Sequence, residues 1–180
     1  MNLKELKELA KTPAFLAEMG DVFFEGMNTG YANNAKKGVI TELPGFKLIP
    51  PYIRGPWKVT DGYHVTLLSS VSGGTTIISY EIGHTSTKLE VPVWMMQYFG
   101  QYDKAAIPCL KIALRTAYEE RRFYAGRGPH FFQYEGFTYH NWIEEGEHRF
   151  DGIFFGAREE IRDQDGIIRG IHQIQGGRMC

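Results

Sequence analysis

Hydrophobic residues near the N-terminus recur at the three- and four-residue spacing of a helix. The first set lies among Lys and Glu residues and consists of Leu3, Leu6, Leu9 and Ala10. The second set consists of Phe15, Leu16, Met19, Phe23 and Met27. This spacing predicts one helix before Thr12 and another over 13–27. Thr12 suits the cap of the second helix, Pro13 suits its first turn, and Asn28-Thr29-Gly30 is expected to end it.

From Tyr63 onward the residues are mostly β-branched and aromatic, which is typical of strands. Turn residues divide this part of the chain into three predicted strands, over 63–71, 75–82 and 89–99. Pro92 indicates that the third strand begins late or lies at a sheet edge, because proline has no backbone N–H to donate to a neighbouring strand.

A third amphipathic helix is expected over 103–122, with Asp103 as its candidate N-cap. Strands then resume after Pro129. The predicted segments are 131–137, 138–144, 150–155, 158–162 and 166–175. A turn at 145–147 and an Asp-Gly turn at 163–166 separate the later segments, and Gly176-Gly177 is expected to end the ordered chain.

Two parts of the strand region share one layout. Each begins with Gly and an aromatic residue, continues through a Glu-Ile strand and ends at Gly, from Gly62 to Gly100 and from Gly136 to Gly176. A duplicated three-strand meander explains this likeness. The alternative is that any two meanders look alike, because both need glycine in turns and aromatic residues in strands.

The pattern predicts an α+β fold, with an antiparallel sheet of about six strands and the N-terminal and central helices packed on it. We expect a single domain over 1–180. Its parts are the helices 1–30, a Pro/Gly-rich loop 31–58, a first meander 60–100, a helix 103–124 and a second meander 130–177. A loop as long as 31–58 either wraps the edge of the core or serves as a lid or contact surface.

The composition is that of a folded, water-soluble protein, with 43% hydrophobic and 23% charged residues. Lys and Arg total 20 and Asp and Glu total 21, so we expect no nucleic-acid partner. The two cysteines and the absence of an apolar leader or a long apolar run predict a cytoplasmic protein without a membrane partner. The cysteines and histidines lack metal-ligand spacing, so neither a metal nor a cofactor is expected.

Aromatic residues make up 14% of the chain and many of them lie on predicted strands. Alternate positions such as Trp94, Met96 and Tyr98 share one face of a strand. That face is either the core or the lining of a pocket between sheet and helices. We therefore predict a non-enzymatic small-molecule-binding or sensing domain. Its candidate ligand-binding residues are Trp94, Tyr98, Arg127, His140 and Trp142.

Two alternatives come from other residues. A small hydrolase or isomerase needs carboxylates and histidines in one cleft, and the candidates are Glu81, Glu160, His64 and His140. A structural or partner-binding oligomer would use the Pro-rich stretch 44–56, and a sheet edge near Pro92 would support a homodimer. The acidic turn with Glu144, Glu145 and Glu147 is either a solvated hairpin tip or a cation site.

The segment from Val93 to Gly100 has the pattern V-W-x-M-x-Y-x-G. It resembles a bacterial domain-of-unknown-function family whose members occur alone or C-terminal to helix-turn-helix regulators. Looser likenesses follow at Gly136-Phe137, Glu159-Glu160-Ile161 and Gly176-Gly177, so the resemblance covers about residues 60–178. The chain departs from the family after Gly30, where a Pro-rich insertion follows. The resemblance implies a fold and a regulatory or sensing context, and it implies no catalytic residues.

Overall fold

The computed structural model describes residues 1–34, 38–39, 45–65, 71–83 and 87–180. Within these ranges the helices are α1 (Leu3–Leu9), α2 (Pro13–Asn28) and α3 (Ile107–Glu119), with 3-10 turns η1 (Tyr31–Asn33) and η2 (Lys104–Ala106). The prediction of a helix over 13–27 is confirmed. The Thr12 side chain accepts a hydrogen bond from the backbone N–H of Phe15, and Pro13 occupies the first turn, as expected. None of these helices is long and apolar enough to cross a membrane.

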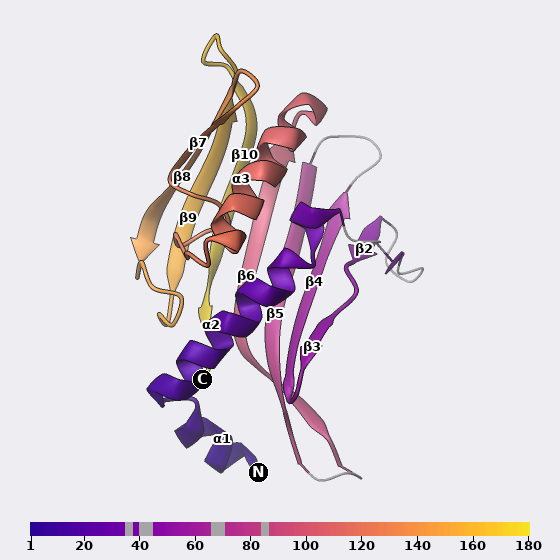
Figure 1. Cartoon of the computed structure of the whole chain (residues 1–180), viewed down its shortest axis with the longest axis vertical. Helices are drawn as coiled ribbons and strands as arrows, with labels where there is room; N and C mark the ends of the chain where they lie inside the picture. The colour runs from indigo at the N-terminus through magenta and orange to yellow at the C-terminus, as the bar shows by residue number, and fades with distance from the viewer. Residues whose placement is uncertain (35–37, 40–44, 66–70, 84–86) are drawn as a thin grey trace.

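The strands in the described part of the chain form one antiparallel sheet. They are β1 (Gly38–Val39), β2 (Phe46–Leu48), β3 (Tyr52–Arg54), β4 (Trp57–Val65), β5 (Val71–Ile82), β6 (Leu89–Tyr102), β7 (Phe131–Tyr134), β8 (Phe137–Gly146), β9 (Phe155–Arg162) and β10 (Ile168–Arg178). Their order is β1-β2-β4-β5-β6-β10-β9-β8-β7, and β3 pairs with the same edge of β4 as β2 does. Helices α2 and α3 lie across one face of this sheet (Figure 1).

The α+β class and the antiparallel sheet are confirmed, but the estimate of about six strands is wrong. Nine strands follow one another in the sheet, and β3 lies beside this path. Three of the additional strands come from the predicted loop 31–58, of which 35–37 and 40–44 lie outside the described residues. The predicted strands 131–137 and 138–144 correspond to β7 and β8, but the boundary between them lies earlier, since β7 ends at Tyr134 and β8 begins at Phe137. Glu135 (φ 46°) and Gly136 (φ 80°) form a two-residue turn between β7 and β8.

The predicted likeness between the two meanders has a structural counterpart. β4-β5-β6 and β8-β9-β10 are both antiparallel meanders, and they join where β6 pairs with β10. The first follows α2 and three short strands, and the second follows α3 and one short strand. Two boundaries in the second meander were predicted wrongly. Residues 150–154 precede β9 rather than forming a strand, and β10 continues through Gly176-Gly177 to Arg178. Residues 66–70 and 84–86 of the first meander lie outside the described residues.

Pro92 lies near the start of a central strand rather than at the sheet edge. Proline is tolerated at this position because β10 pairs with β6 only from Trp94 onward. At Pro92 the edge of β6 that faces β10 is therefore not paired with it. On the other side the pairing of β5 with β6 shifts register between Ile78 and Ser79, beside Pro92. A bulge of this kind relieves the missing N–H of proline within a sheet.

The core fills the space between the helices and the sheet with aromatic rings. Trp94 is fully buried, and its ring stacks on Phe150 at 4.9 Å and lies 5.1 Å from Phe23 of α2. Its indole N–H donates to the backbone carbonyl of Phe150. The face of β6 that carries Trp94, Met96 and Tyr98 is thus the buried one, as the alternation of the strand predicts.

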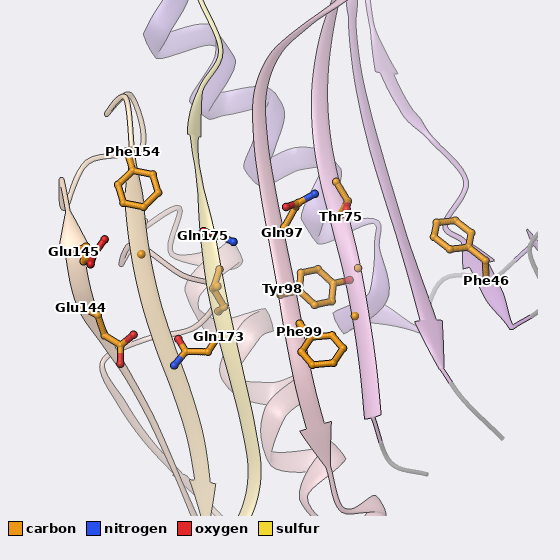
Figure 2. Close-up of a pocket in the computed structure, with 14 residues that line it drawn as sticks. Phe46, Thr75, Gln97, Tyr98, Phe99, Glu144, Glu145, Phe154, Gln173 and Gln175 are labelled. Atoms are coloured by element: carbon orange, nitrogen blue, oxygen red, sulfur yellow. The ribbon is translucent and has the colours of Figure 1, made fainter. Parts of the chain in front are cut away.

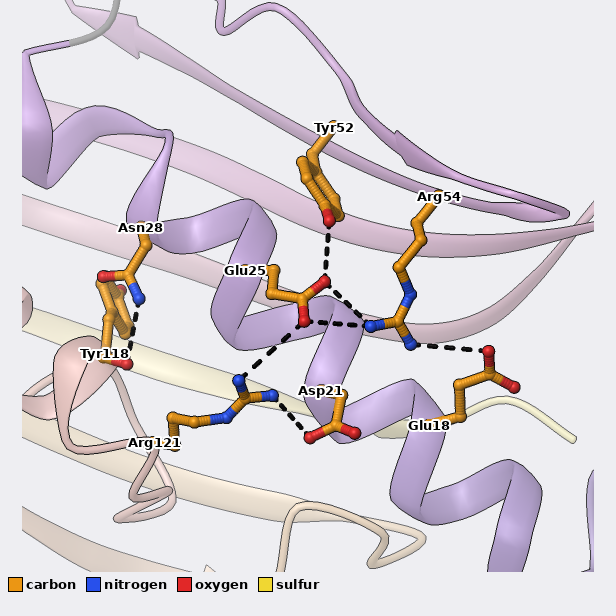
Figure 3. A network of polar contacts seen from close by, with 8 residues as sticks. All are labelled: Glu18, Asp21, Glu25, Asn28, Tyr52, Arg54, Tyr118 and Arg121. Carbon is orange, nitrogen blue, oxygen red and sulfur yellow. Dashed lines mark hydrogen bonds and ion pairs between the residues drawn. The ribbon is translucent and has the colours of Figure 1, made fainter.

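Helix α2 is held in place by a polar network on its exposed side (Figure 3). Glu25 accepts hydrogen bonds from the Tyr52 hydroxyl at 2.7 Å and from the Arg54 guanidinium at 2.9 Å, both on β3. Asp21 pairs with Arg121, which follows α3. These contacts fix α2 against the sheet and α3, and thereby position the residues that both helices cover.

Candidate functional site

A buried ion pair lies at the centre of the face that the helices cover. Arg127, in the segment between α3 and β7, pairs with Glu159 of β9, and both side chains are at least nine-tenths buried. Nη2 of Arg127 also lies 3.0 Å from Nδ1 of His172 on β10. The Arg127 guanidinium lies over the Tyr98 ring, 4.3 Å from its centroid. A charge so enclosed requires partners around it, and the chain supplies them from three strands, β6, β9 and β10.

Two tyrosines complete the hydrogen bonds of Glu159. The Tyr139 hydroxyl donates to Oε2 at 2.6 Å, and the Tyr102 hydroxyl donates to Oε1. Burial by itself would raise the pKa of Glu159, but the charge of Arg127 and the hydrogen bonds from Arg127 and Tyr102 hold that pKa below its usual value. Glu159 is therefore a carboxylate, and its remaining acceptor positions are occupied by phenols.

Ser72, His172 and Glu159 have the spacing of a catalytic triad. Oγ of Ser72 lies 3.2 Å from Nε2 of His172, and Oε1 of Glu159 lies 3.5 Å from Nδ1. Arg127, however, is a donor only, so Nδ1 facing it must be the unprotonated nitrogen. Nε2 then carries the hydrogen and donates to Ser72, which is the reverse of what a general base needs. Burial and the Arg127 charge also lower the pKa of His172 to about 3.

Asp61 of β4 is a second buried carboxyl on this face. It accepts a hydrogen bond from Thr76 of β5 at 2.9 Å. Burial raises the pKa of Asp61, and the hydrogen bond from Thr76 and the charge of Arg127 oppose that rise. Asp61 and Arg127 line one cavity of about 10 Å³ between α2, α3 and the sheet, together with Met27, Tyr31, Ala32, Tyr98, Leu114 and Tyr118. This cavity is far too small for the ligand pocket predicted between sheet and helices.

The opposite face of the sheet carries a larger, open groove of about 620 Å³ (Figure 2). It crosses β5, β6, β10 and β9 and reaches β8. Its lining residues are Phe46, Gly73, Gly74, Thr75, Gln97, Tyr98, Phe99, Glu144, Glu145, Phe154, Gly156, Gln173, Ile174 and Gln175. Figure 2 shows the side chains of Gln97, Phe99 and Gln173 on the near side of the strands, with the helices behind.

The groove offers neutral hydrogen-bonding groups between aromatic rings. Gln97, Gln173 and Gln175 present amides that both donate and accept, while Phe99 and Phe154 are 65% and 42% exposed. The charged residues among its lining side chains are Glu144 and Glu145. Such a lining suits an uncharged or positively charged polar molecule and disfavours an anion.

Glycines form part of the groove floor. Gly73 lies beneath the Phe99 ring, and a Cβ at that position would meet the ring at 3.1 Å. Gly156 on β9 has ordinary van der Waals space above it, with Glu145 3.6 Å from a built Cβ. The absence of a side chain makes room for the Phe99 ring at Gly73, and it leaves the groove floor low at Gly156.

The structure separates the five predicted ligand-binding residues into three places. Tyr98 and Arg127 are brought together in the buried cluster, and Tyr98 also lines the groove. Trp94 lies in the aromatic core. His140 and Trp142 lie on β8, outside the groove lining. Trp142 is 38% exposed, and the Arg158 guanidinium lies 5.7 Å from its ring centroid.

The four residues of the hydrolase alternative do not share one cleft. His140 and Glu160 are direct register partners on β8 and β9. Glu160 is ion-paired to Arg158 and Arg162, which lower its pKa against the opposing effect of burial. Glu81 binds Lys88 near the end of β5, and His64 pairs in register with Gly73, eight positions earlier in that strand. Eight residues of strand span about 26 Å, so His64 and Glu81 lie well apart.

Sequence reasoning missed Glu159, His172, Tyr102 and Tyr139, which build the buried cluster. Strand alternation could have found two of them. Glu159 alternates with Ala157 and Ile161, and His172 alternates with Ile174, so both fall on an otherwise apolar face. A charged residue on such a face requires a buried partner. The only sequence feature that points to the groove is the set of glutamines Gln97, Gln173 and Gln175. They lie on β6 and β10, which become neighbours only in the fold.

No protein-family description, curated protein or solved structure matches this chain. Within the described residues, no group of three or more His, Cys, Asp or Glu side chains has the geometry to hold a metal ion.

Proposed function

We propose that the protein is a non-enzymatic binding domain that takes a small, uncharged or positively charged polar molecule in the groove on the open face of its sheet. The groove itself is the observation that carries this proposal. Its volume of about 620 Å³ falls within the range of small-molecule sites, and amides and aromatic rings converge on it from neighbouring strands. Of the described residues considered for acid-base catalysis, His172 is held in the wrong tautomer and Glu160 is held in ion pairs.

Tyr98 supports the sensing part of this proposal. Tyr98 belongs to the stretch of β6 that forms the groove floor, while its ring lies on the helix-covered face, under the Arg127 guanidinium and stacked on His172 at 5.7 Å. A ligand in the groove would therefore lie against the strand whose other face carries a ring of the buried ionic cluster. The likeness of Val93–Gly100 to a family that accompanies transcription regulators agrees with a sensing role, and it remains a proposal.

The test is a fragment screen by NMR with two matched sets of compounds. One set contains neutral amides, polyols and alkylammonium ions, and the other contains carboxylates and phosphates of similar size. We expect the first set to shift the side-chain amide signals of Gln97, Gln173 and Gln175. If the anions perturb these signals and the neutral and cationic compounds do not, the proposed ligand chemistry is wrong. If neither set perturbs them, the groove is not a ligand site.

Variants on one strand provide the control. Gln97→Ala removes an exposed amide from the groove, whereas Gln101→Ala removes an equally exposed amide of β6 that does not line it. We expect Gln97→Ala to weaken binding of the best fragment several-fold and Gln101→Ala to leave it unchanged. Gly156→Leu places a side chain in the groove from a position where a Cβ makes only ordinary van der Waals contacts, and it should abolish binding without unfolding the protein.

A homodimer through the same face is a second candidate function. Ile153 and Phe154 are 69% and 42% exposed beside the groove, and Phe99 is 65% exposed within it. Apolar side chains gathered in this way are typical of contact surfaces. Sedimentation over a range of concentrations should then show a dimer that Phe154→Glu dissociates. A monomer at all concentrations contradicts this candidate and leaves the small-molecule proposal intact.

A further inference from the structure

The small cavity under the helices has polar walls. Its volume is about 10 Å³, which corresponds to roughly one water molecule. Asp61 comes from β4, Tyr98 from β6, Tyr118 from α3 and Arg127 from the segment after α3. Met27, Ala32 and Leu114 close the apolar side. The cavity lies on the covered face of the sheet and is separate from the groove, although Tyr98 contributes to both.

Two of the polar atoms at this cavity have no hydrogen-bond partner among the described residues. They are Nε of Arg127 and the hydroxyl of Tyr118, and both side chains are more than nine-tenths buried. Leaving a buried donor unpaired costs about 1–3 kcal/mol, and more for a charged group. Two such atoms at one small polar cavity point to an occupant that bonds to both.

The chemistry of the walls limits what this occupant is. Nε–H of Arg127 only donates, so the occupant must accept a hydrogen bond. An oxygen of the Asp61 carboxyl accepts hydrogen bonds in either protonation state, as it does from Thr76, so an occupant that also donates gains a partner there. An ammonium ion fails because it cannot accept from Arg127, and a halide ion fails because it cannot donate to Asp61. A single oxygen that both donates and accepts meets every condition.

We propose that this cavity binds one water molecule that accepts a hydrogen bond from Nε of Arg127, donates to Asp61 and bonds to the Tyr118 hydroxyl. Among the described residues, Asp61 and Arg127 share no direct hydrogen bond, and this water would link them. The Asp61–Thr76 pair belongs to the first meander, and the Arg127–Glu159–His172 cluster is built mainly on the second. The water thus connects the polar centres of the two halves across the sheet.

The direct test is a high-resolution crystal structure of the whole chain. We expect one ordered density peak within hydrogen-bond distance of both Nε of Arg127 and the Tyr118 hydroxyl. Two results would overturn the proposal. One is density for a larger molecule or a heavier ion at this position. The other is a direct hydrogen bond from Nε of Arg127 to a protein atom, with the cavity closed.

A second test, in solution, uses the direction in which Tyr118→Phe shifts the urea midpoint of unfolding. If water partners the Tyr118 hydroxyl, Tyr118→Phe removes a satisfied hydrogen bond and lowers the urea midpoint of unfolding. If the hydroxyl is unpartnered, the same change relieves a buried unpaired group and leaves the midpoint unchanged or raises it. Phenylalanine keeps the shape of the ring, so the fold is not at risk. Tyr124→Phe, at a half-buried tyrosine that does not line the cavity, is the matched control and should leave the midpoint unchanged.

Discussion

Nη2 of Arg127 lies 3.0 Å from Nδ1 of His172, and this contact fixes which nitrogen of the histidine carries the proton. A guanidinium always donates, so Nδ1 accepts and Nε2–H points to Ser72. The same contact keeps the histidine neutral, because a second positive charge beside Arg127 is unfavourable. Burial and the Arg127 charge together lower the pKa of His172 to about 3, against the opposing effect of Glu159.

This depressed pKa makes the stability of the protein depend on pH. In the unfolded chain His172 takes up a proton near pH 6.5, whereas in the native state it does so only near pH 3. Between these values the unfolded state binds more protons, so the free energy of unfolding decreases as the pH falls. From about pH 7 to about pH 5 the expected loss from His172 is roughly 2 kcal/mol.

Urea unfolding of the wild type and of His172→Gln at both pH values isolates this effect. Asp61, whose raised pKa acts in the opposite direction, is present in both proteins, and so are Arg127 and Glu159. We expect the loss of stability between the two pH values to be smaller in His172→Gln. An equal loss in both proteins would show that His172 titrates normally in the native state.

Glu159 is expected to matter more for stability than its neighbour Glu160. Glu159→Gln leaves the Arg127 charge buried without its partner, and breaking a buried ion pair in this way costs about 3–5 kcal/mol. Glu160→Gln frees Arg158 and Arg162, whose side chains are 30% and 42% exposed and remain hydrated. Its cost should stay near 1 kcal/mol. Chemical denaturation of both variants decides this, and equal costs would contradict the assigned role of the Arg127 pair.

The sequence predicts local features of this fold better than features that depend on distant residues. The spacing of Phe15, Met19 and Phe23 predicts α2, and the Asp165-Gly166 turn correctly separates β9 from β10. The sequence does not predict short strands such as β3, because three residues alone have too weak a preference for the extended conformation. Pairing with β4 stabilises that conformation in the fold. Pro92 predicts a late strand start or a sheet edge because proline restricts its own strand, whereas the bulge that accommodates it, with Val93 as the extra residue of β6, depends on the pairing with β5.

The candidate site was predicted only in part for the same reason. Tyr98 and Arg127 are separate candidates in the sequence, 29 positions apart, and the fold places one over the other. Their partner Glu159 was passed over in favour of Glu160, the adjacent residue on the opposite face of β9. A shift of one residue exchanges the two faces of a strand, so composition alone cannot choose between neighbouring carboxylates.

The two tryptophans among the predicted ligand residues should behave very differently. Trp94 is fully buried with its N–H bonded to Phe150, so Trp94→Phe should cost about 1–3 kcal/mol of unfolding free energy. Trp142 is 38% exposed, and Trp142→Phe should change stability by less than about 0.5 kcal/mol. Acrylamide should quench the fluorescence of Trp142, which is the part lost in Trp142→Phe. It should not quench the fluorescence of Trp94, which is the part lost in Trp94→Phe. Quenching of Trp94 would mean that the core opens to solvent.

Glycine at position 74 is required by the buried cluster and not by the groove. A Cβ there would overlap the Tyr98 hydroxyl and the backbone carbonyl of Gly62, and neither can move without disturbing the sheet. Gly74→Ala should therefore destabilise the protein by about 1–3 kcal/mol through overpacking. Gly156→Ala is the matched control, because its Cβ meets neighbours only at 3.6 Å and beyond.

The NMR signals of His172 in the two variants also distinguish an effect on the cluster from an effect on the groove. Displacement of Tyr98 by Gly74→Ala should change its stacking on His172, which is visible as a shift of the His172 ring signals in NMR. Gly156→Ala should leave those signals in place. If Gly74→Ala is as stable as the wild type with unchanged His172 signals, then Tyr98 is not held against Gly74, and its proposed role between groove and cluster is lost.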